Sequence, residues 1–266
     1  MDAPAERVVI LDFGAQYAQL IARRVRDLEV YAEILPCTTP AAVLRERKPV
    51  GIVLSGGPAS VYAPGAPRCE ADVLRLGIPV LAICYGMQLA SHLLGGEVRP
   101  APAREYGRTA LRVTDARDLL DGVPVETTVW MSHGDSVDRV SADFVPMATT
   151  TNCPLAAVRH RTLPVFGVQF HPEVAHTVPG PTILKNFLYR VCGAKGEWKT
   201  ASMVERAIAS VRATAGDAGI VCGLSGGVDS AVVALCCHRA VGARLTCLFV
   251  DNGLLRQDER ASVEEA

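Results

Sequence analysis

The stretch PVLAICYGMQLASHLLGG, residues 79–96, decides the fold, because a strand pattern turns directly into a helix pattern inside it. Its first half is a short apolar run, which is typical of a strand buried on both faces of a parallel sheet. Its second half has a helical pattern, which Gly95 and Gly96 are expected to end. The stretch therefore predicts an α/β fold with Cys84 at the turn between strand and helix.

Apolar runs of the same kind recur on both sides of this stretch. The other strands are predicted at 7–13, 30–36 and 51–57 and, in a β-rich region at 104–170, at 108–114, 127–132, 146–150 and 163–170. Helical patterns lie at 19–28 and 183–192. The alternation predicts an open, mostly parallel sheet with helices on both faces.

The pattern begins again after GAKGEWKT (193–200), which is typical of a linker. A helix, a strand, a helix and a strand are predicted at 202–216, 219–227, 229–242 and 244–253. We therefore assign residues 1–195 to one domain and 196–266 to a second α/β domain. This second domain is expected to be incomplete, because an open sheet normally has roughly four to six strands.

Composition excludes several classes of protein. The 266 residues carry 27 basic and 28 acidic side chains, so no global positive field favours nucleic acid as a partner. No apolar run approaches the roughly 20 residues that span a bilayer, so no membrane partner is expected. The nine cysteines form no CxxC pair, which argues against a disulfide framework or zinc site and favours a cytoplasmic protein.

Cys84 has the surroundings of a nucleophile. The start of a helix favours the thiolate, and Gly86 removes a side chain that would crowd the turn. His171 and Glu173 follow a predicted strand, on which residues two apart share a face, so Glu173 is expected to orient His171 toward the thiol. The N–H of Tyr85 and a donor from SGGP (55–58) are expected to meet the oxyanion.

A second site is predicted at SGGVDS (225–230), between a strand and a helix. Gly226 and Gly227 let backbone N–H groups turn inward, while Ser225 and Ser230 add hydroxyl groups. With the helix dipole, these groups form a site for phosphate. The loop lacks the lysine of a Walker A motif, so transfer of a γ-phosphate is not favoured.

These motifs resemble known families. CYGMQ together with GVQFHPEV resembles the class I glutamine amidotransferases, which have a flavodoxin-like fold. SGGVDS resembles the pyrophosphate loop of the N-type ATP pyrophosphatases, whose fold is adenine nucleotide hydrolase-like. The flanking segments are similar to the GMP synthetase branch: LDFGAQYAQLIARRVR (11–26), LSGGPASVY (54–62), WMSHGDSV (130–137), HPEVAHT (171–177) and LTCLFVDNGLLRQDE (245–259).

The resemblance implies a role for each matching residue. Cys84 would be the nucleophile, His171 the general base and Glu173 its orienting carboxylate. The remaining assignments are Gly57 and Tyr85 for the oxyanion hole, Gln88, Ser132 and His133 for glutamine, and Ser225, Gly226, Gly227, Val228, Asp229 and Ser230 for ATP. Asp229 would also help to hold Mg²⁺.

The resemblance implies a reaction in two steps. Glutamine is hydrolysed to ammonia, and ATP then activates XMP, which ammonia converts to GMP with release of AMP and pyrophosphate. ATP with Mg²⁺ is a substrate, no prosthetic group is implied, and the full-length enzyme is expected to be a homodimer. The XMP-binding and dimer-forming segments have no counterpart before Ala266, so the second step is expected to need further sequence.

Other functions stay open. One is another glutamine-dependent ATP pyrophosphatase, such as an NAD synthetase. A tRNA-thiolating enzyme would share SGGVDS, but the glutaminase motifs and the near-neutral charge argue against it. A third is a regulatory module whose glutaminase activity is silent without a partner.

Overall fold

The computed structural model describes residues 6–251, 253, 260, 261 and 263. The chain divides after Trp198 into two compact units, which we describe separately. Residues 192–199 contain no helix or strand, and the boundary predicted after residue 195 lies in this stretch.

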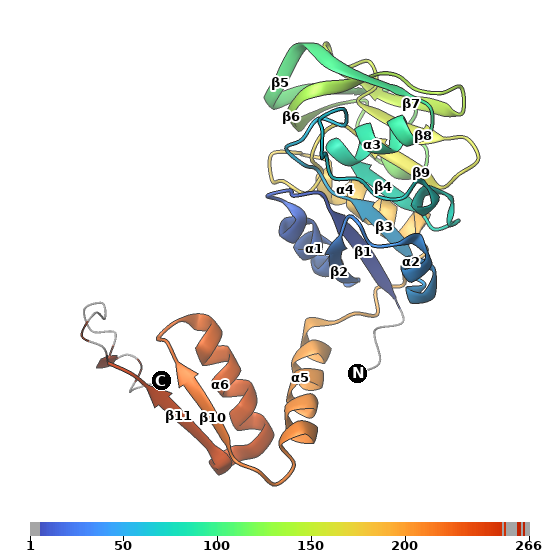
Figure 1. Ribbon diagram of the computed structural model, residues 1–266. Helices are drawn as coiled ribbons and strands as arrows, with labels where there is room; N and C mark the ends of the chain where they lie inside the picture. Colours follow the sequence, from blue (N-terminus) through green and yellow to red (C-terminus); the bar gives the residue numbers. More distant parts are fainter. Residues whose placement is uncertain (1–5, 252, 254–259, 262, 264–266) are drawn as a thin grey trace. The chain divides into compact units, whose positions relative to one another are not determined.

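The first unit contains a nine-stranded sheet in the order β2-β1-β3-β4-β9-β8-β7-β5-β6 (Figure 1). Its parallel half consists of β1 (Arg7–Asp12), β2 (Tyr31–Pro36), β3 (Gly51–Leu54), β4 (Val80–Ile83) and β9 (Val165–Val168). Its antiparallel half consists of β5 (Glu97–Val113), β6 (Glu126–Arg139), β7 (Phe144–Thr149) and β8 (Ala157–His160). The predicted open α/β sheet is confirmed, with an antiparallel extension that the prediction of a mostly parallel sheet did not include.

Both faces of this sheet are covered. Along β1, Val8 and Ile10 pack into one hydrophobic cluster and Val9 and Leu11 into another, because successive side chains point to opposite faces. The first cluster includes side chains of α1 (Ala18–Asp27) and α4 (Gly180–Lys185). The second includes side chains of α2 (Ala41–Arg47) and α3 (Tyr85–Leu93). The parallel strands are therefore buried on both sides, as their apolar sequences predict.

Some elements differ from their prediction. The helix α2 and the strand β8 were not predicted, and β5 extends over 17 residues where only its second half had a strand pattern. The closing helix begins at Gly180 and continues as a π-helix, Asn186–Val191. Short 3-10 helices lie at Ala71–Arg75, Asp118–Leu120 and Gly242–Arg244.

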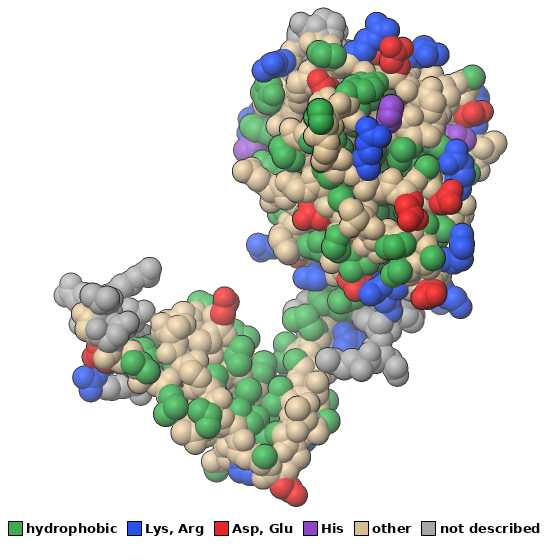
Figure 2. All heavy atoms as spheres, in the orientation of Figure 1, with side chains coloured by type: hydrophobic (Ala, Val, Ile, Leu, Met, Phe, Trp, Pro, Cys, Tyr) green, Lys and Arg blue, Asp and Glu red, His purple; other side chains and the backbone are tan. Residues whose placement is uncertain are grey.

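The second unit has the predicted order of elements. It contains α5 (Thr200–Ala215), β10 (Ile220–Leu224), α6 (Val228–Val241) and β11 (Leu245–Phe249), and the two strands are parallel. Figure 2 shows green, hydrophobic side chains on the surface of this unit. Its exposed large apolar side chains include Val221, Val228, Val232, Val233, Leu235 and Leu248. Such a surface is typical of a site of interaction with further protein.

No described helix combines the length and apolar composition needed to cross a bilayer.

Candidate active site

Cys84 lies at the turn between β4 and α3, as predicted. Its backbone has φ 50° and ψ −108°, a conformation that costs a residue other than glycine about 1–3 kcal/mol. The surrounding structure holds it there, because the N–H of Cys84 donates to the carbonyl of Val168 on β9 at 2.8 Å. The thiol is consequently presented at the first turn of α3, where the helix dipole favours an anion.

This backbone conformation predicts an effect on stability. We expect Cys84→Gly to have a free energy of unfolding about 1–2 kcal/mol higher than that of Cys84→Ala, because glycine adopts positive φ without steric cost. Both variants lack the sulfur, so their difference isolates the backbone. Chemical denaturation measures it, and equal stabilities would show that the turn carries no strain.

Gly86 is required by the close approach of the end of β3 to the turn. A Cβ atom at this position would lie 2.6 Å from the carbonyl oxygen of Leu54 and 2.9 Å from that of Ser55. These are backbone atoms, and the N–H of Gly86 donates to Ser55 O at 3.1 Å, so relief would require β3 to move away from the turn.

We therefore expect Gly86→Ala to lower the free energy of unfolding by about 3 kcal/mol. The matched control is Gly134→Ala in the same unit, because the nearest atoms to its added Cβ are at 3.8 Å, an ordinary contact. Urea denaturation of both variants measures the effect. Similar losses at the two positions would contradict the steric argument.

His171 and Glu173 lie together, but not on a strand. The strand β9 ends at Val168, and Pro172 and Glu173 form a turn, so the expectation that the pair shares a strand face is wrong. The turn instead folds the carboxylate back to the ring, with Oε1 of Glu173 2.7 Å from Nδ1 of His171.

Three hydrogen bonds from separate segments hold this turn. The N–H of His171 donates to Trp130 O on β6 at 3.0 Å, and the hydroxyl of Thr177 donates to His171 O at 2.6 Å. Nε of Arg24 on α1 donates to Glu173 O at 3.0 Å. The imidazole is therefore fixed by contacts from α1, from β6 and from the segment that follows it, which a local strand pattern does not contain.

The imidazole of His171 is the charged centre of the site. Burial lowers its pKa, but hydrogen bonds to the side chains of Cys84 and Glu173, with their negative charges, raise the pKa to about 10. At neutral pH the ring, which lies between the sulfur and the carboxylate, is therefore protonated. The second oxygen of Glu173, Oε2, is buried and has no hydrogen-bond partner among the described residues.

Cys84 and His171 both open into one cavity of about 720 Å³. Of the other predicted site residues, Gly57, Gln88, Ser132 and His133 also line it. Glu173 lies behind His171, and the Tyr85 hydroxyl points away, donating to Pro67 O at 2.6 Å. The remaining lining residues are Gly14, Ala15, Gln16, Tyr17, Gly56, Pro58, Ala59, Ser60, Arg104, Tyr106, Gly134 and Asp135.

The backbone donors predicted for an oxyanion have suitable local structure. Gly57 lies where a Cβ would be 2.8 Å from the carbonyl oxygen of Phe13, so only glycine allows this close packing at the cavity wall. Tyr85 is the first residue of α3, and N–H groups in a first turn have no carbonyl partner within the helix. Their catalytic role stays a prediction.

The sulfur of Cys84 has two polar neighbours, of which Ser132 was predicted as a site residue and Gln169 was not. The sulfur of Cys84 lies 3.7 Å from Ser132 O, and Nε2 of Gln169 donates to it at the same distance, 3.7 Å. Sequence reasoning missed Gln169, and it missed Tyr17, whose ring meets the His171 ring edge-on with centroids 5.4 Å apart. The position of Gln169 two residues before His171 was a signal for it, whereas Tyr17 comes from the start of α1 and had none.

The predicted phosphate loop lies in the second unit between β10 and α6. Gly226 has φ 77° and Gly227 precedes the helix, whose first turn begins with Val228 and Asp229. The hydroxyl of Ser230 accepts the N–H of Ser225 at 3.1 Å and donates to Gly227 O at 2.9 Å. The strand–loop–helix arrangement is therefore as predicted, while phosphate binding stays a prediction.

The fold and this site define a class. The chain belongs to the class I glutamine amidotransferase family, whose model matches residues 9–191. A second family model, NAD synthase, matches residues 201–261.

Its curated relatives are GMP synthases. The GMP synthase (glutamine-hydrolyzing) of Acetivibrio thermocellus is 52% identical over 260 residues, which are 98% of this chain and 51% of that protein. The GMP synthase of Caldanaerobacter subterraneus is 49% identical over 265 residues, which are 100% of this chain and 52% of that protein. The resemblance to GMP synthetases is thus confirmed, and the chain spans about half the length of these relatives.

Two solved structures support the fold. A candidate GMP synthase subunit from Thermoplasma acidophilum is 28% identical, with a TM-score of 0.63, and the match covers 77% of this chain and 100% of that one. A glutamine amidotransferase from Thermotoga maritima is 17% identical, with a TM-score of 0.57 over 72% of this chain and 100% of that one. At that identity the second likeness shows the fold alone.

Proposed function

We propose that this chain hydrolyses glutamine to glutamate and ammonia, with Cys84, His171 and Glu173 as the reacting group. The observation that carries the proposal is the buried thiol, imidazole and carboxylate at one cavity, where Cys84 and His171 both line the wall and Glu173 bonds to His171. A thiolate beside a protonated imidazole has the nucleophile and the acid that amide cleavage needs.

The reaction follows from these positions. The sulfur of Cys84 attacks the carboxamide carbon, and the negative charge on oxygen is met by the N–H groups of Gly57 and Tyr85. The proton on His171 goes to the leaving nitrogen, so ammonia departs and a glutamyl thioester remains. His171, now neutral, takes a proton from water, which hydrolyses the thioester and regenerates the thiol–imidazole pair. Gln88, Ser132 and His133 would form the wall against the rest of glutamine.

For the longer protein we propose ATP-dependent amination of XMP to GMP. The support is the identity with GMP synthases across both units and the anion-loop architecture of residues 225–230. Asp229 and the two serine hydroxyls are oxygen donors, the type that Mg²⁺ prefers, and Mg²⁺ bound there would offset phosphate charge. The homodimer implied by the resemblance stays a prediction.

Glutamate release tests the proposal. The chain is incubated with L-glutamine, with L-asparagine as the matched control, and each with and without ATP and XMP. Release from glutamine alone supports an autonomous glutaminase, and release only with ATP and XMP supports one regulated by the synthetase site. No release under any condition, from the chain or from the protein extended to the length of its relatives, would exclude the function.

The NAD synthase match at 201–261 supports a second candidate for the longer protein. Transfer of ammonia to XMP or to deamido-NAD, measured with that protein, separates the two.

A further inference from the structure

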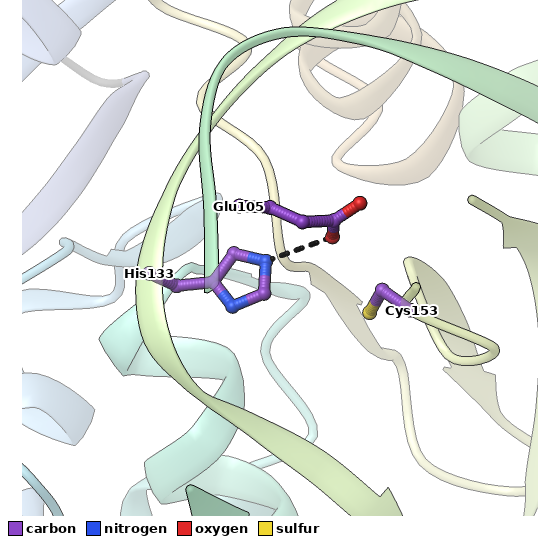
Figure 3. A group of neighbouring side chains, drawn as sticks. All are labelled: Glu105, His133 and Cys153. Atoms are coloured by element: carbon purple, nitrogen blue, oxygen red, sulfur yellow. Dashed lines mark hydrogen bonds and ion pairs between the residues drawn. The ribbon is translucent and has the colours of Figure 1, made fainter. Parts of the chain in front are cut away.

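A buried acid–base pair lies beside the cavity, apart from the thiol and its base. Glu105 on β5 and His133 on β6 are 5% and 4% exposed. Oε2 of Glu105 lies 3.2 Å from Nε2 of His133, and Figure 3 shows the two side chains pointing toward each other from neighbouring strands. The other carboxylate oxygen, Oε1, accepts the hydroxyl of Thr150 at 2.8 Å.

The pair sits where the register of the two strands breaks. Glu105 is opposite His133, and the next matched position is Pro100 opposite Asp135. Four residues of β5 (101–104) therefore face the single residue Gly134 of β6. Irregularities of this kind commonly redirect a strand next to a functional site. The last regular cross-strand contact before the break is the Glu105–His133 pair.

Both nitrogens of the His133 ring are bound within the protein. Nδ1 lies 3.0 Å from the carbonyl oxygen of Asp135, which can only accept, so Nδ1 carries a proton. Nε2 faces Glu105. The ring thus connects Glu105 to the backbone of 133–135 and has no nitrogen left for a substrate, which makes His133 a wall of the cavity rather than a direct polar contact.

The segment held in this way touches the thiol and its neighbour. The carbonyl oxygen of Ser132 lies 3.7 Å from the sulfur of Cys84. The carbonyl of Asp135 accepts Nε2 of Gln88 at 2.8 Å, the same oxygen that faces His133. Displacement of residues 132–135 would therefore move the cavity wall against Cys84 and Gln88.

We propose that Glu105 and His133 are positioning residues that fix segment 132–135 as the glutamine-facing wall of the cavity. This inference rests on the proposed glutaminase function. Since neither side chain reaches the reacting atoms, their loss weakens substrate binding and leaves the chemical step nearly intact. The effect on KM for glutamine is about tenfold, the scale of one lost hydrogen bond to a charged group.

A metal ion is the alternative occupant of this place. The ligand atoms of Glu105, His133 and Cys153 all lie within 4.8 Å of one another. The hydrogen bonds of the pair account for the cluster without an ion, and Cys153 supplies a control position next to it.

The test compares Glu105→Leu, Glu105→Gln and Cys153→Ala in glutamate release. We expect Glu105→Leu to raise KM about tenfold with kcat within about threefold of wild type. Glu105→Gln retains a hydrogen bond to the ring and restores KM to within about threefold. Cys153→Ala leaves KM unchanged. If Glu105→Leu does not fold, Thr150→Val takes its place in the test. This substitution removes the hydrogen bond to Oε1 of Glu105, and we expect it to cause a smaller rise in KM.

A second readout separates this inference from the proposed function. Iodoacetamide alkylation of Cys84, followed by mass spectrometry of its peptide, gives the glutamine concentration that half-protects the thiol. In Glu105→Leu that concentration rises about tenfold, while alkylation without glutamine proceeds at the wild-type rate. A wild type that glutamine does not protect defeats the proposed function. Three results would defeat the positioning role. The first is equal protection by glutamine in wild type and Glu105→Leu. The others are the same changes in kcat and KM in all three variants, and stoichiometric zinc in the purified protein.

Discussion

Replacing Cys84 with alanine abolishes glutamate release from glutamine, with an expected loss of about 10⁴-fold or more. The reason is that in the proposed reaction the sulfur forms the covalent bond to the substrate, and no other described cysteine lines the cavity. Alanine keeps a Cβ in the same strained turn, so β4 and α3 retain their packing. The loss is checked by measuring the glutamate formed at successive times by the purified wild-type and variant proteins.

The matched control is Cys69→Ala. Cys69 is also buried in the first unit, and burial raises the pKa of its thiol to about 12, so it is not a nucleophile at neutral pH. We expect this variant to release glutamate at the wild-type rate. If Cys84→Ala kept more than about one hundredth of the wild-type activity, Cys84 could not be the nucleophile.

Replacing His171 with glutamine lowers kcat for glutamate release by about 10³-fold, within the range for loss of a general acid–base group. Glutamine has no group that gains and loses a proton near neutral pH, so neither protonation of the leaving nitrogen nor activation of water is assisted. His171, with a pKa of about 10, is positively charged at neutral pH. Its replacement by glutamine therefore also removes the charged partner of the thiolate. Alkylation of Cys84 by iodoacetamide at pH 7 should slow as well.

His176→Gln is the control for this substitution. His176 is exposed, and its ring lies against that of Trp130 with centroids 4.8 Å apart and planes tilted by 33°; it does not line the cavity. Its replacement should leave both glutamate release and Cys84 alkylation unchanged. If His171→Gln lost activity while alkylating at the wild-type rate, His171 would act on the substrate without supporting the thiolate.

The parts of the site that are local in sequence could be predicted. The Cys84 turn follows from an apolar strand running into a helix, with Gly86 marking the close approach to β3. The strand–loop–helix at 225–230 follows from the same kind of pattern. In both cases neighbouring residues contain the order of strand, turn and helix, although the Cys84 turn is also held by Val168 on β9.

The proximity of His171 and Glu173 was predicted for the wrong local reason. Residues two apart do share a strand face, but here a turn brings the carboxylate to the ring. That turn is fixed by Arg24 and Thr177, whose bonds to it cannot be inferred from residue spacing.

The first half of β5 could not be predicted, and with it the pair at Glu105. Pro100 lies within that strand, and proline normally argues against a strand interior. Pairing with β6 across a register break accommodates it, and this pairing joins residues far apart in the chain. The segment LTCLFVDNGLLRQDE is only partly described, because residues 252 and 254–259 lie outside the described part of the chain.

The strand β6 ends the sheet, with β5 as its neighbour. Its Trp130 carbonyl anchors the loop of His171, and its Ser132 carbonyl meets the sulfur of Cys84. One edge strand thus contacts both the imidazole loop and the thiol. In the proposed reaction, a displacement of this strand would disturb the acid and the nucleophile together.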